Sequence, residues 1–523
     1  MLIKEKSHLG YELVRSLKKN FFHMGLIDHG LPNPVRMKRG TILVLALDLA
    51  KELKEQIPDK RVGVVLPSGA GGVIANIGLI LADKIPVNLN FTLGEESLRY
   101  SMKKAEVSTI ISAAAVREKI TDFPWPQDIF DLGSWLRNKR KQKGQMIWNH
   151  LQVFLCPVPR IIHSLGVMSD PDQEAALLFT SGSSGNPKGV VLSHQNLLSN
   201  CQQIESVQLF ASQSYLLANL PLFHSFGFTV SMLYTMLSDL VIVCLPSPLD
   251  VKKSLEVIER EKVEVLLGTP TFLRGYLRKA KKEQMESIRF VVAGAEKTPD
   301  GFKEDWESLC PCSYLEGYGL TESSPAISFN LPGDGMREKS VGRLLPDIQG
   351  KTISTETSEA LPEGEVGVLC FLGPNIFSGY LDDDEADSMA FDDQGWYITG
   401  DLGRIDPDGF LFIEGRLSRF SKIGGEMVPH TKVENVISEI FFPDGSDQVN
   451  CAVIGLPDPV KGEKLILLTT EDFEMQALRK KLLAKGIPNL WIPKESKKVP
   501  EIPILASGKL DLSELKRLGL SSN

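Results

Sequence analysis

The 523-residue chain has few cysteines, and they are scattered. Seven are present, only Cys310 and Cys312 lie close together, and no second Cys or His pair completes the spacing of a zinc site. Dispersed thiols of this kind are typical of the reducing cytosol, where structural disulfides are rare. We therefore expect a cytoplasmic location.

An excess of basic residues and a long apolar run are also missing. The chain has 58 Lys and Arg against 66 Asp and Glu, a net charge of −8. Nucleic-acid-binding domains are usually basic, so no nucleic-acid partner is expected. The first residues lack the apolar core of a signal peptide. The longest apolar stretches, 72–82 and 228–245, are too short or are interrupted by Ser238 and Asp239, so no membrane span is expected.

Short apolar runs alternate with amphipathic stretches between residues 61 and 322. The runs lie at 62–67, 86–90, 216–222, 240–246, 263–267 and 289–293, and the amphipathic stretches include 251–262 and 271–282. This alternation predicts an α/β fold, with βα units around largely parallel sheets in two layers. Between residues 340 and 415, short strands with Gly and Pro turns predict a smaller, barrel-like β subdomain.

The length allows three or four structural units, at about 150 residues per domain. We expect an N-terminal domain over residues 1–415, divided into βα subdomains at 1–170 and 171–339 and the β-rich subdomain at 340–415. A small α+β domain over residues 416–523 is expected to follow.

Residues 134–165 combine basic and aromatic side chains. The basic residues Arg137, Lys139, Arg140, Lys141 and Lys143 lie between Trp135 and Trp148. Such a segment can bind an anionic membrane surface, which would place the protein at the inner face of the cell membrane. The alternative is a solvated loop or helix face inserted in the first subdomain, because charge runs usually face solvent.

A loop rich in glycine and hydroxyl residues is the strongest chemical signal. The strand expected at 175–179 leads into residues 180–189, TSGSSGNPKG. Its backbone N–H groups can wrap phosphate oxygens, and Lys188 adds a positive charge. A Walker A loop starting at Gly182 would need Gly at position 187, which is Pro. A flexible Gly/Ser turn is the alternative, but the preceding strand and the NPKG ending favour a phosphate site.

This loop resembles the signature loop of the acyl-adenylate-forming superfamily, which includes acyl-CoA synthetases, luciferases and the adenylation domains of peptide synthetases. Further motifs of the superfamily follow in order at 221–228 (PLFHSFGF), 292–296 (VAGAE), 316–322 (EGYGLTE), 397–401 (YITGD), 415–416 (GR) and 507–509 (SGK). The resemblance implies an enzyme that uses ATP and Mg²⁺ to activate a carboxylic acid. It also implies a mobile C-terminal domain.

The same resemblance assigns roles to individual residues. Glu322 is an oxygen ligand suited to Mg²⁺, Thr321 would donate to the α-phosphate, Tyr318 would stack on adenine, and Asp401 and Arg416 would bind the ribose or phosphate. For Asp401 and Arg416, a surface ion pair is the alternative. The full ATP-binding set is Thr180, Ser181, Gly182, Ser183, Ser184, Gly185, Lys188, Gly294, Ala295, Glu296, Glu316, Gly317, Tyr318, Gly319, Asp401 and Arg416.

Catalysis is assigned to Lys509, with Thr321, Glu322 and His224. A lysine that bridges acyl and phosphate oxygens offsets the repulsion between two anions. By resemblance His224 gates the acyl channel, although a lone His in an apolar run is more often a core residue. After adenylation the C-terminal domain would rotate, so that Lys422, Gly424 and Gly425 line a thiol tunnel.

The hinge of that rotation departs from the superfamily pattern. Ser418 stands where Asp or Lys is usual. The sequence therefore leaves open which residue absorbs the backbone change.

Six further segments lie at 223–227 (FHSFG), 246–249 (PSPL), 268–273 (GTPTFL), 291–297 (VVAGAEK), 373–376 (GPNI) and 424–428 (GGEMV). They resemble segments of the bacterial acyl-acyl carrier protein synthetases, including the synthetase half of 2-acylglycerophosphoethanolamine acyltransferase. This resemblance implies a long-chain fatty acid and the phosphopantetheine thiol of acyl carrier protein. Seven basic residues against Glu495 alone in 479–498 fit a dock for that acidic partner. A fatty acyl-CoA synthetase and a non-catalytic lipid- or AMP-binding protein are the alternatives. An acyltransferase-like His23-x4-Asp28 spacing is interpreted as coincidence.

Overall fold

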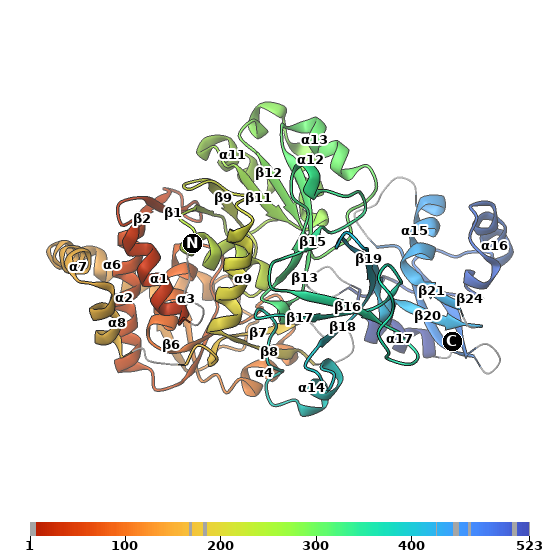
Figure 1. Ribbon diagram of the computed structural model, residues 1–523, viewed down its shortest axis with the longest axis horizontal. Helices are drawn as coiled ribbons and strands as arrows, with labels where there is room; N and C mark the ends of the chain where they lie inside the picture. The colour runs from red at the N-terminus through yellow and green to blue at the C-terminus, as the bar shows by residue number, and fades with distance from the viewer. Residues whose placement is uncertain are drawn as a thin grey trace.

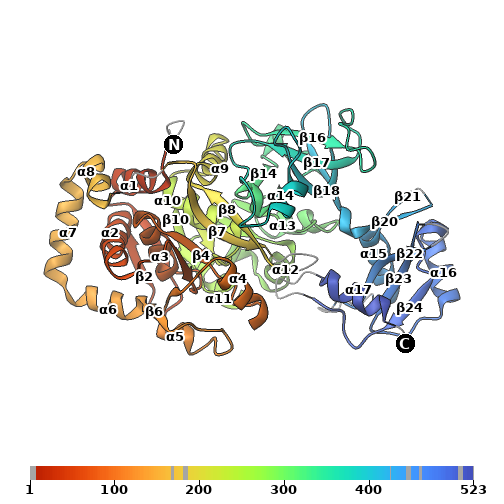
Figure 2. The same cartoon turned by 90° about the horizontal axis from the view of Figure 1, so that it is seen from below.

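The computed structural model describes residues 7–166, 170–180, 186–424, 426–442, 449–458, 462–504 and 510–521. It contains two large β-sheets, a four-stranded sheet and a five-stranded sheet. Figures 1 and 2 show the first three sheets in one large body and the last in a smaller C-terminal body, drawn in blue. The predicted α/β fold with a large N-terminal and a smaller C-terminal domain is confirmed.

The first large sheet has six strands in the order β6-β5-β3-β4-β7-β8. Its strands are parallel except for the β7–β8 hairpin. Their bounds are β3 (Arg61–Val64), β4 (Ile85–Asn88), β5 (Thr109–Ser112), β6 (Asp128–Asp131), β7 (Glu174–Thr180) and β8 (Lys188–Ser193). The connecting helices are α3 (Ala70–Leu81), α4 (Glu95–Lys104) and α5 (Ala114–Arg117). Every residue of α3 except Gly71 is buried, because a helix that is apolar all round belongs in a core.

The second large sheet has nine strands in the order β15-β14-β13-β12-β11-β9-β10-β1-β2. From β13 to β1 the neighbours are parallel, while β2, β14 and β15 pair antiparallel at the edges. The bounds are β1 (Met24–Asp28), β2 (Val35–Lys38), β9 (Tyr215–Ala218), β10 (Val241–Cys244), β11 (Val265–Gly268), β12 (Phe290–Ala293), β13 (Ser313–Gly319), β14 (Ala326–Phe329) and β15 (Arg343–Leu344).

Helices surround this second sheet. They are α1 (Leu9–Lys19), α2 (Arg39–Gln56), α9 (His194–Ser206), the π-helix η1 (Phe226–Tyr234), α10 (Thr235–Leu237), α11 (Val251–Glu261), α12 (Pro270–Lys279) and α13 (Phe302–Leu309). The predicted amphipathic stretches 251–262 and 271–282 correspond to α11 and α12. Because the parallel strands are buried on both faces, they read in the sequence as continuous apolar runs.

The expected boundary near residue 170 does not separate the two large sheets. Strands β1 and β2 precede that residue but belong to the nine-stranded sheet, whereas β7 and β8 follow it but belong to the six-stranded sheet. The chain therefore crosses between the layers more than once. Sequence patterns mark the strands but not the distant partner with which each one pairs.

Residues 132–165 form three successive helices at one end of the molecule (Figures 1 and 2). They are α6 (Leu132–Lys141), α7 (Lys143–Leu155) and α8 (Val158–Leu165). The basic and aromatic segment at 134–165 is thus helical.

The β-rich subdomain is an antiparallel sheet in the order β16-β17-β18-β19. Its strands are β16 (Gln349–Ile353), β17 (Gly367–Leu372), β18 (Tyr397–Ile405) and β19 (Leu411–Arg416), and α14 (Asp384–Ala390) lies between β17 and β18. A barrel-like arrangement is expected from the sequence. The strand order is open, with β16 and β19 at its two edges.

The C-terminal sheet runs β21-β20-β23-β22, and β24 pairs with β23. Its strands are β20 (Phe420–Ile423), β21 (Glu426–Pro429), β22 (Cys451–Asp458), β23 (Gly462–Thr469) and β24 (Glu495–Lys498). The helices are α15 (His430–Phe441), α16 (Met475–Ala484) and α17 (Leu512–Leu520). The 3-10 helix η5 (Leu417–Arg419), which contains Ser418, connects β19 to β20.

Candidate active site

The β7–β8 hairpin positions the two ends of the predicted phosphate loop. Thr180 ends β7, Lys188 begins β8, and the two residues stand opposite each other in register. The predicted residues Ser181, Gly182, Ser183, Ser184 and Gly185 lie outside the described residues. The Lys188 ammonium lies 4.8 Å from the centre of the Tyr380 ring, a cation–π arrangement. The hairpin therefore aims one positive charge at a specific aromatic side chain.

The same aromatic residue contacts Glu322. The Tyr380 hydroxyl donates a hydrogen bond of 2.9 Å to Oε1 of Glu322. Glu322 is buried in the 3-10 helix η3 (Thr321–Ser323), which follows β13. Burial raises the pKa of the Glu322 carboxyl, because desolvation disfavours its charged form. Lys188, Tyr380 and Glu322 form a chain of contacts between the two large sheets.

Asp401 and Arg416 are neighbours across the β18–β19 ladder. Arg416 Nε lies 3.1 Å from Oδ1 of Asp401, and the Tyr318 hydroxyl donates to Oδ2 at 2.6 Å. The Asp401 carboxylate raises the pKa of the Arg416 guanidinium, whose side chain is half exposed. Burial raises the pKa of Tyr318. The predicted ribose-binding residues are thus brought together, and the carboxylate of Asp401 already has two partners.

The two predicted nucleotide segments lie side by side at the ends of β12 and β13, which are parallel neighbours. Residues 294–296 follow β12, and 316–319 end β13. A Cβ atom on Gly294 would lie 3.4 Å from the Gly317 carbonyl oxygen, so the two backbones approach closely. Ala295 has φ of +68°, and Glu296 accepts hydrogen bonds from the backbone and hydroxyl of Thr271. Glu296 is therefore held by the start of α12.

The predicted aromatic and His motif approaches η3. The hydroxyl oxygens of Ser225 and Thr321 are 3.5 Å apart. His224 is exposed just before the π-helix η1, and its Nδ1 accepts a hydrogen bond of 3.3 Å from the Phe226 backbone. π-Helical turns are frequent at functional sites. His224 is therefore a surface residue beside the Thr321–Glu322 turn and not a core residue.

Two predicted catalytic or tunnel positions are not described. Lys509 and Gly425 lie outside the described residues. Gly424 has φ of +57°, a conformation that favours glycine, in the β20–β21 turn. Lys422 Nζ on β20 lies 2.5 Å from Oε1 of Glu356, which is in the turn after β16, and both side chains are exposed.

The Glu322 carboxylate is suited to be a ligand of an Mg²⁺ ion that is bound together with ATP. Among the residues that the structure describes, no group of three or more His, Cys, Asp or Glu side chains could hold a metal. Mg²⁺ usually takes one or two carboxylates together with substrate phosphates and waters, so a full protein cage is not needed. Glu322 offers a buried carboxylate beside the Lys188 end of the phosphate loop. The ion would therefore be bound jointly by this carboxylate and the nucleotide.

Comparison with known proteins agrees with this geometry. The AMP-binding enzyme family matches residues 45–381, so the chain belongs to the AMP-binding enzymes. It is 27% identical over 514 residues to the long-chain-fatty-acid–CoA ligase of Bacillus subtilis, covering 90% of this chain and 88% of the relative. It is 28% identical over 479 residues to probable 4-coumarate–CoA ligase 2 of Dictyostelium discoideum, covering 87% of this chain and 85% of that protein.

Solved structures share the fold. ATP-bound MatB from Rhodopseudomonas palustris superposes with a TM-score of 0.77 at 24% identity, covering 98% of this chain and 99% of that one. The o-succinylbenzoate coenzyme A synthetase of Bacillus subtilis, in complex with ATP and magnesium ion, gives 0.77 at 21% identity, covering 97% and 99%. The predicted cofactors, ATP and Mg²⁺, are those of this second neighbour.

Proposed function

We propose that this enzyme activates a long-chain fatty acid with ATP and Mg²⁺ and transfers the acyl group to the thiol of coenzyme A. The observation that carries the proposal is a cluster of charged residues in an AMP-binding enzyme: Lys188 and Glu322 both contact Tyr380, and Asp401 pairs with Arg416. The two groups belong to one site because the charges of Arg416 and Asp401 both act on the Glu322 carboxyl. The fatty-acid ligase of Bacillus subtilis, which is similar over 90% of the chain, supports the choice of acid.

The first half-reaction joins two anions. A carboxylate oxygen of the fatty acid attacks the α-phosphate, the bond to the β-phosphate oxygen breaks, and pyrophosphate leaves with acyl-AMP remaining. Positive charge from Lys188 and Arg416 offsets the repulsion, and Lys509 acts in the same way at the reacting oxygens. Mg²⁺ at Glu322 would neutralise phosphate charge. Asp401 would orient the ribose.

The second half-reaction passes the acyl group to sulfur. The thiolate attacks the acyl carbon, a thioester forms, and AMP leaves. We propose that the C-terminal domain turns about η5 between the steps, withdrawing Lys509 and bringing Lys422 and Gly424 to the site. The turn is placed there because η5 is the short connector between β19, the last strand of the four-stranded sheet, and β20, the first strand of the C-terminal sheet, and Ser418 lies within it.

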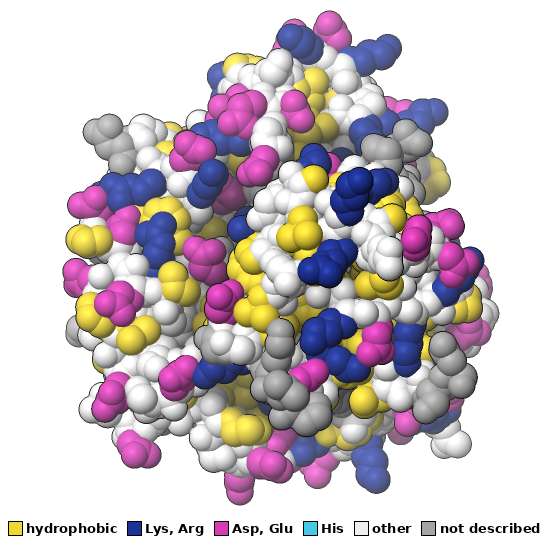
Figure 3. All heavy atoms as spheres, turned by 90° about the vertical axis from the view of Figure 1, so that its right-hand side faces the viewer, with side chains coloured by type: hydrophobic (Ala, Val, Ile, Leu, Met, Phe, Trp, Pro, Cys, Tyr) yellow, Lys and Arg dark blue, Asp and Glu magenta, His cyan; other side chains and the backbone are white. Residues whose placement is uncertain are grey.

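Acyl carrier protein is the second candidate for the thiol. Arg479, Lys480 and Lys494 are exposed and, of the residues described, no acidic side chain lies within ion-pairing distance of them. Figure 3 shows the end of the molecule that carries the C-terminal domain. Lys and Arg side chains gather across this face, with acidic side chains around them. Lys485 and Lys498 already pair with Glu439 and Asp472. The named relatives are CoA ligases, so coenzyme A is favoured.

Isotope exchange tests the activation step. Labelled pyrophosphate should enter ATP only when a long-chain fatty acid is present. No exchange with any acid tested would leave a non-catalytic binding protein and refute the proposal. Labelled palmitate and ATP should then be offered with coenzyme A or with holo-acyl carrier protein. A product on the carrier protein alone would replace coenzyme A as the acceptor without affecting the activation step.

Lys509→Ala separates the two half-reactions. This variant should lose adenylation but still form thioester from supplied acyl-AMP, because the lysine acts only while the carboxylate attacks the phosphate. An equal loss of both steps would contradict a rotating C-terminal domain.

A further inference from the structure

Helix α7 exposes an apolar face that no described element covers. The exposed side chains are Ile147, Trp148, Leu151, Phe154 and Leu155, at positions i, i+1, i+4, i+7 and i+8 of one helix. Ile147 is 72% and Leu155 68% exposed. A surface helix of a soluble protein normally turns polar residues outward. The outer face of α7 therefore has the apolar composition of a binding surface.

The inner side of α7 is anchored, so the exposed face is held in a fixed direction. Asn149 Nδ2 donates to Oδ2 of Asp48 on α2 at 2.9 Å, and His150 Nε2 lies 3.2 Å from the Thr41 hydroxyl. Lys18 of α1 donates to the Val153 carbonyl at 2.8 Å. The outer residues project from a helix that is packed against the main body.

A second element extends the apolar face. Phe22, which follows α1, is 60% exposed, and its ring centre lies 5.2 Å from that of Phe154. Lys38 Nζ lies 5.9 Å from the Phe22 ring centre. We call Phe22 together with the five exposed residues of α7 the α7 face. It is built from segments far apart in the sequence and has basic residues at its edge.

Basic residues precede the α7 face along the chain, on α6 and at the first residue of α7. Residues 132–169 contain six Lys and Arg and no Asp or Glu, although the whole chain carries −8. Within the described part of the chain, Arg137, Arg140, Lys141 and Lys143 have no acidic side chain at ion-pairing distance. Their charge is therefore available to an external anion.

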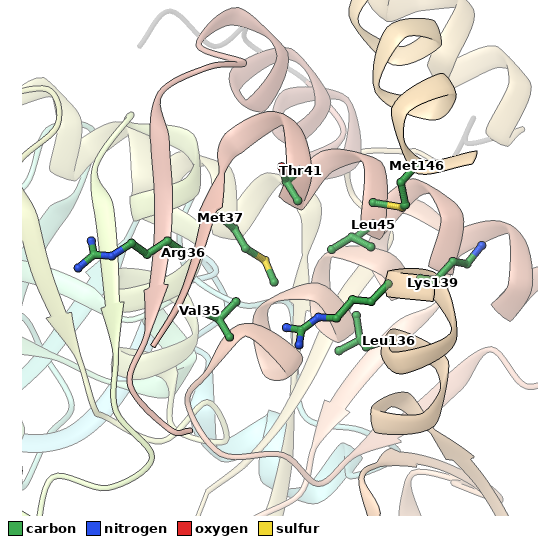
Figure 4. A pocket seen from close by; sticks show the side chains of 9 residues that line it. Val35, Arg36, Met37, Thr41, Leu45, Leu136, Lys139 and Met146 are labelled. Carbon is green, nitrogen blue, oxygen red and sulfur yellow. The ribbon is translucent and has the colours of Figure 1, made fainter. Parts of the chain in front are cut away.

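A pocket lies between β2, α2, α6 and the inward side of α7, which contributes Met146 (Figure 4). Its cavity of about 270 Å³ has apolar walls that include Met37, Leu45, Leu136 and Met146, and Arg140 contributes to its lining. Apolar walls beside a cationic group match an anionic amphiphile, which has a charged head and an apolar chain.

We propose that the α7 face docks on the surface of a membrane that contains anionic phospholipids. An amphipathic helix rich in Trp, Phe and Leu lies in the plane of the interface, with its apolar face at the acyl boundary. Nearby Lys and Arg residues add electrostatic attraction to anionic headgroups. None of the helices within the described residues is long and apolar enough to cross the bilayer, so the contact is interfacial.

A second copy of the chain fits this face less well. In a two-fold dimer the same patch meets itself, so the two basic clusters would face each other without acidic partners. The membrane also suits the direction of the face. The face lies at the end of the molecule opposite the C-terminal domain (Figures 1 and 2), so docking leaves that domain free for its thiol substrate.

Vesicle co-sedimentation of the full chain tests the proposal. We expect binding to phosphatidylcholine vesicles that contain phosphatidylglycerol, weaker binding in high salt, and little binding to pure phosphatidylcholine. Leu151→Glu combined with Leu155→Glu should abolish sedimentation. Lys141→Ala combined with Lys143→Ala should weaken it roughly thirtyfold, at about 1 kcal/mol for each lysine. The matched control is Leu249→Glu, at a leucine that is 75% exposed elsewhere, which should bind as the wild type does.

Trp148 supplies a second readout in the same samples. Its fluorescence should shift to shorter wavelength on anionic vesicles, and Trp148→Phe should remove that shift while retaining sedimentation. Unchanged binding by the double Glu variant, or equal binding to neutral and anionic vesicles, would overturn the proposal. Conversion of a dimer to a monomer by the double Glu variant in light scattering would instead assign the face to a second copy and also overturn it.

Discussion

The Tyr380 hydroxyl donates a 2.9 Å hydrogen bond to Oε1 of Glu322, while the Lys188 ammonium lies over the ring of the same tyrosine. One side chain thus orients both the proposed metal ligand and the phosphate-loop lysine. No motif in the sequence marks Tyr380, which lies far from both partners along the chain. The loop around it reaches the hairpin because the Leu381 backbone N–H donates to the Gly189 carbonyl.

Tyr380→Phe isolates the hydroxyl. It removes the hydrogen bond but keeps the ring beneath Lys188. We expect about a tenfold rise in the Mg²⁺ concentration needed for half-maximal pyrophosphate exchange, from the loss of a hydrogen bond to a buried carboxylate. Tyr380→Ala should raise this Mg²⁺ concentration further, because it also removes the cation–π contact with Lys188. Equal Mg²⁺ dependence in wild type and Tyr380→Phe would show that the hydroxyl does not orient Glu322.

Glu322→Gln should stabilise the metal-free protein while abolishing activity. Because burial raises the pKa of Glu322 in the folded state, the folded protein holds a proton there more tightly than the unfolded chain. That stabilisation is complete below the ordinary Glu pKa of about 4.3 and is lost as the pH rises through the raised pKa. Above the raised pKa the Glu322 carboxylate is ionised and its burial costs free energy, which an amide avoids.

Thermal melts in the presence of a chelator measure this effect. The melting temperature of Glu322→Gln should exceed that of the wild type at neutral pH, and the difference should narrow as the pH falls toward the ordinary Glu pKa. Glu256→Gln, at an exposed position of α11, serves as the control and should show little difference. A higher melting temperature for the wild type than for Glu322→Gln at neutral pH would show that burial of the Glu322 carboxylate does not destabilise the protein.

Much of the fold could be predicted from local pattern. Strands β9, β10 and β11 are buried on both faces, so each appears in the sequence as a short apolar run between polar turns. Pairing partners could not be predicted. Leu26 of β1 pairs with Ile242, and nothing local specifies a contact over such a separation. Global packing decides which layer receives each strand.

The candidate active site also contains some residues that could be predicted from the sequence and others that could not. The predictable residues belong to motifs, because phosphate, a metal ion and ribose each require particular side chains to bind them. They are Lys188, Glu322, Asp401 and Arg416. Tyr380 acts only through its neighbours, so its role depends on packing. The exposed apolar face of α7 likewise depends on which side of the helix meets α2, and this cannot be derived from the composition of residues 134–165.

Asp401→Asn tests the ribose assignment. The amide keeps nearly the same shape, but it removes the charge that pairs with Arg416 and weakens acceptance of ribose hydroxyl protons. We expect KM for ATP to rise roughly tenfold while KM for the fatty acid stays the same. Asp408→Asn is a matched control in the β18–β19 turn, because it removes only an exposed pair with Arg337. If both kinetic constants changed together in Asp401→Asn, the residue would have a structural role instead.

The contact between Lys422 and Glu356 joins β20 of the C-terminal sheet to the turn after β16, and it must break if the domain turns. Both side chains are exposed, so solvent screens the pair and it contributes little. Glu356→Gln should therefore change either half-reaction less than about fivefold. Lys422→Ala should slow thioester formation from supplied acyl-AMP much more, because it also removes a proposed lining residue of the thiol tunnel. Stopped-flow measurement of each half-reaction separates the two effects. Identical small effects of the two substitutions would confine Lys422 to the ion pair and exclude it from the tunnel.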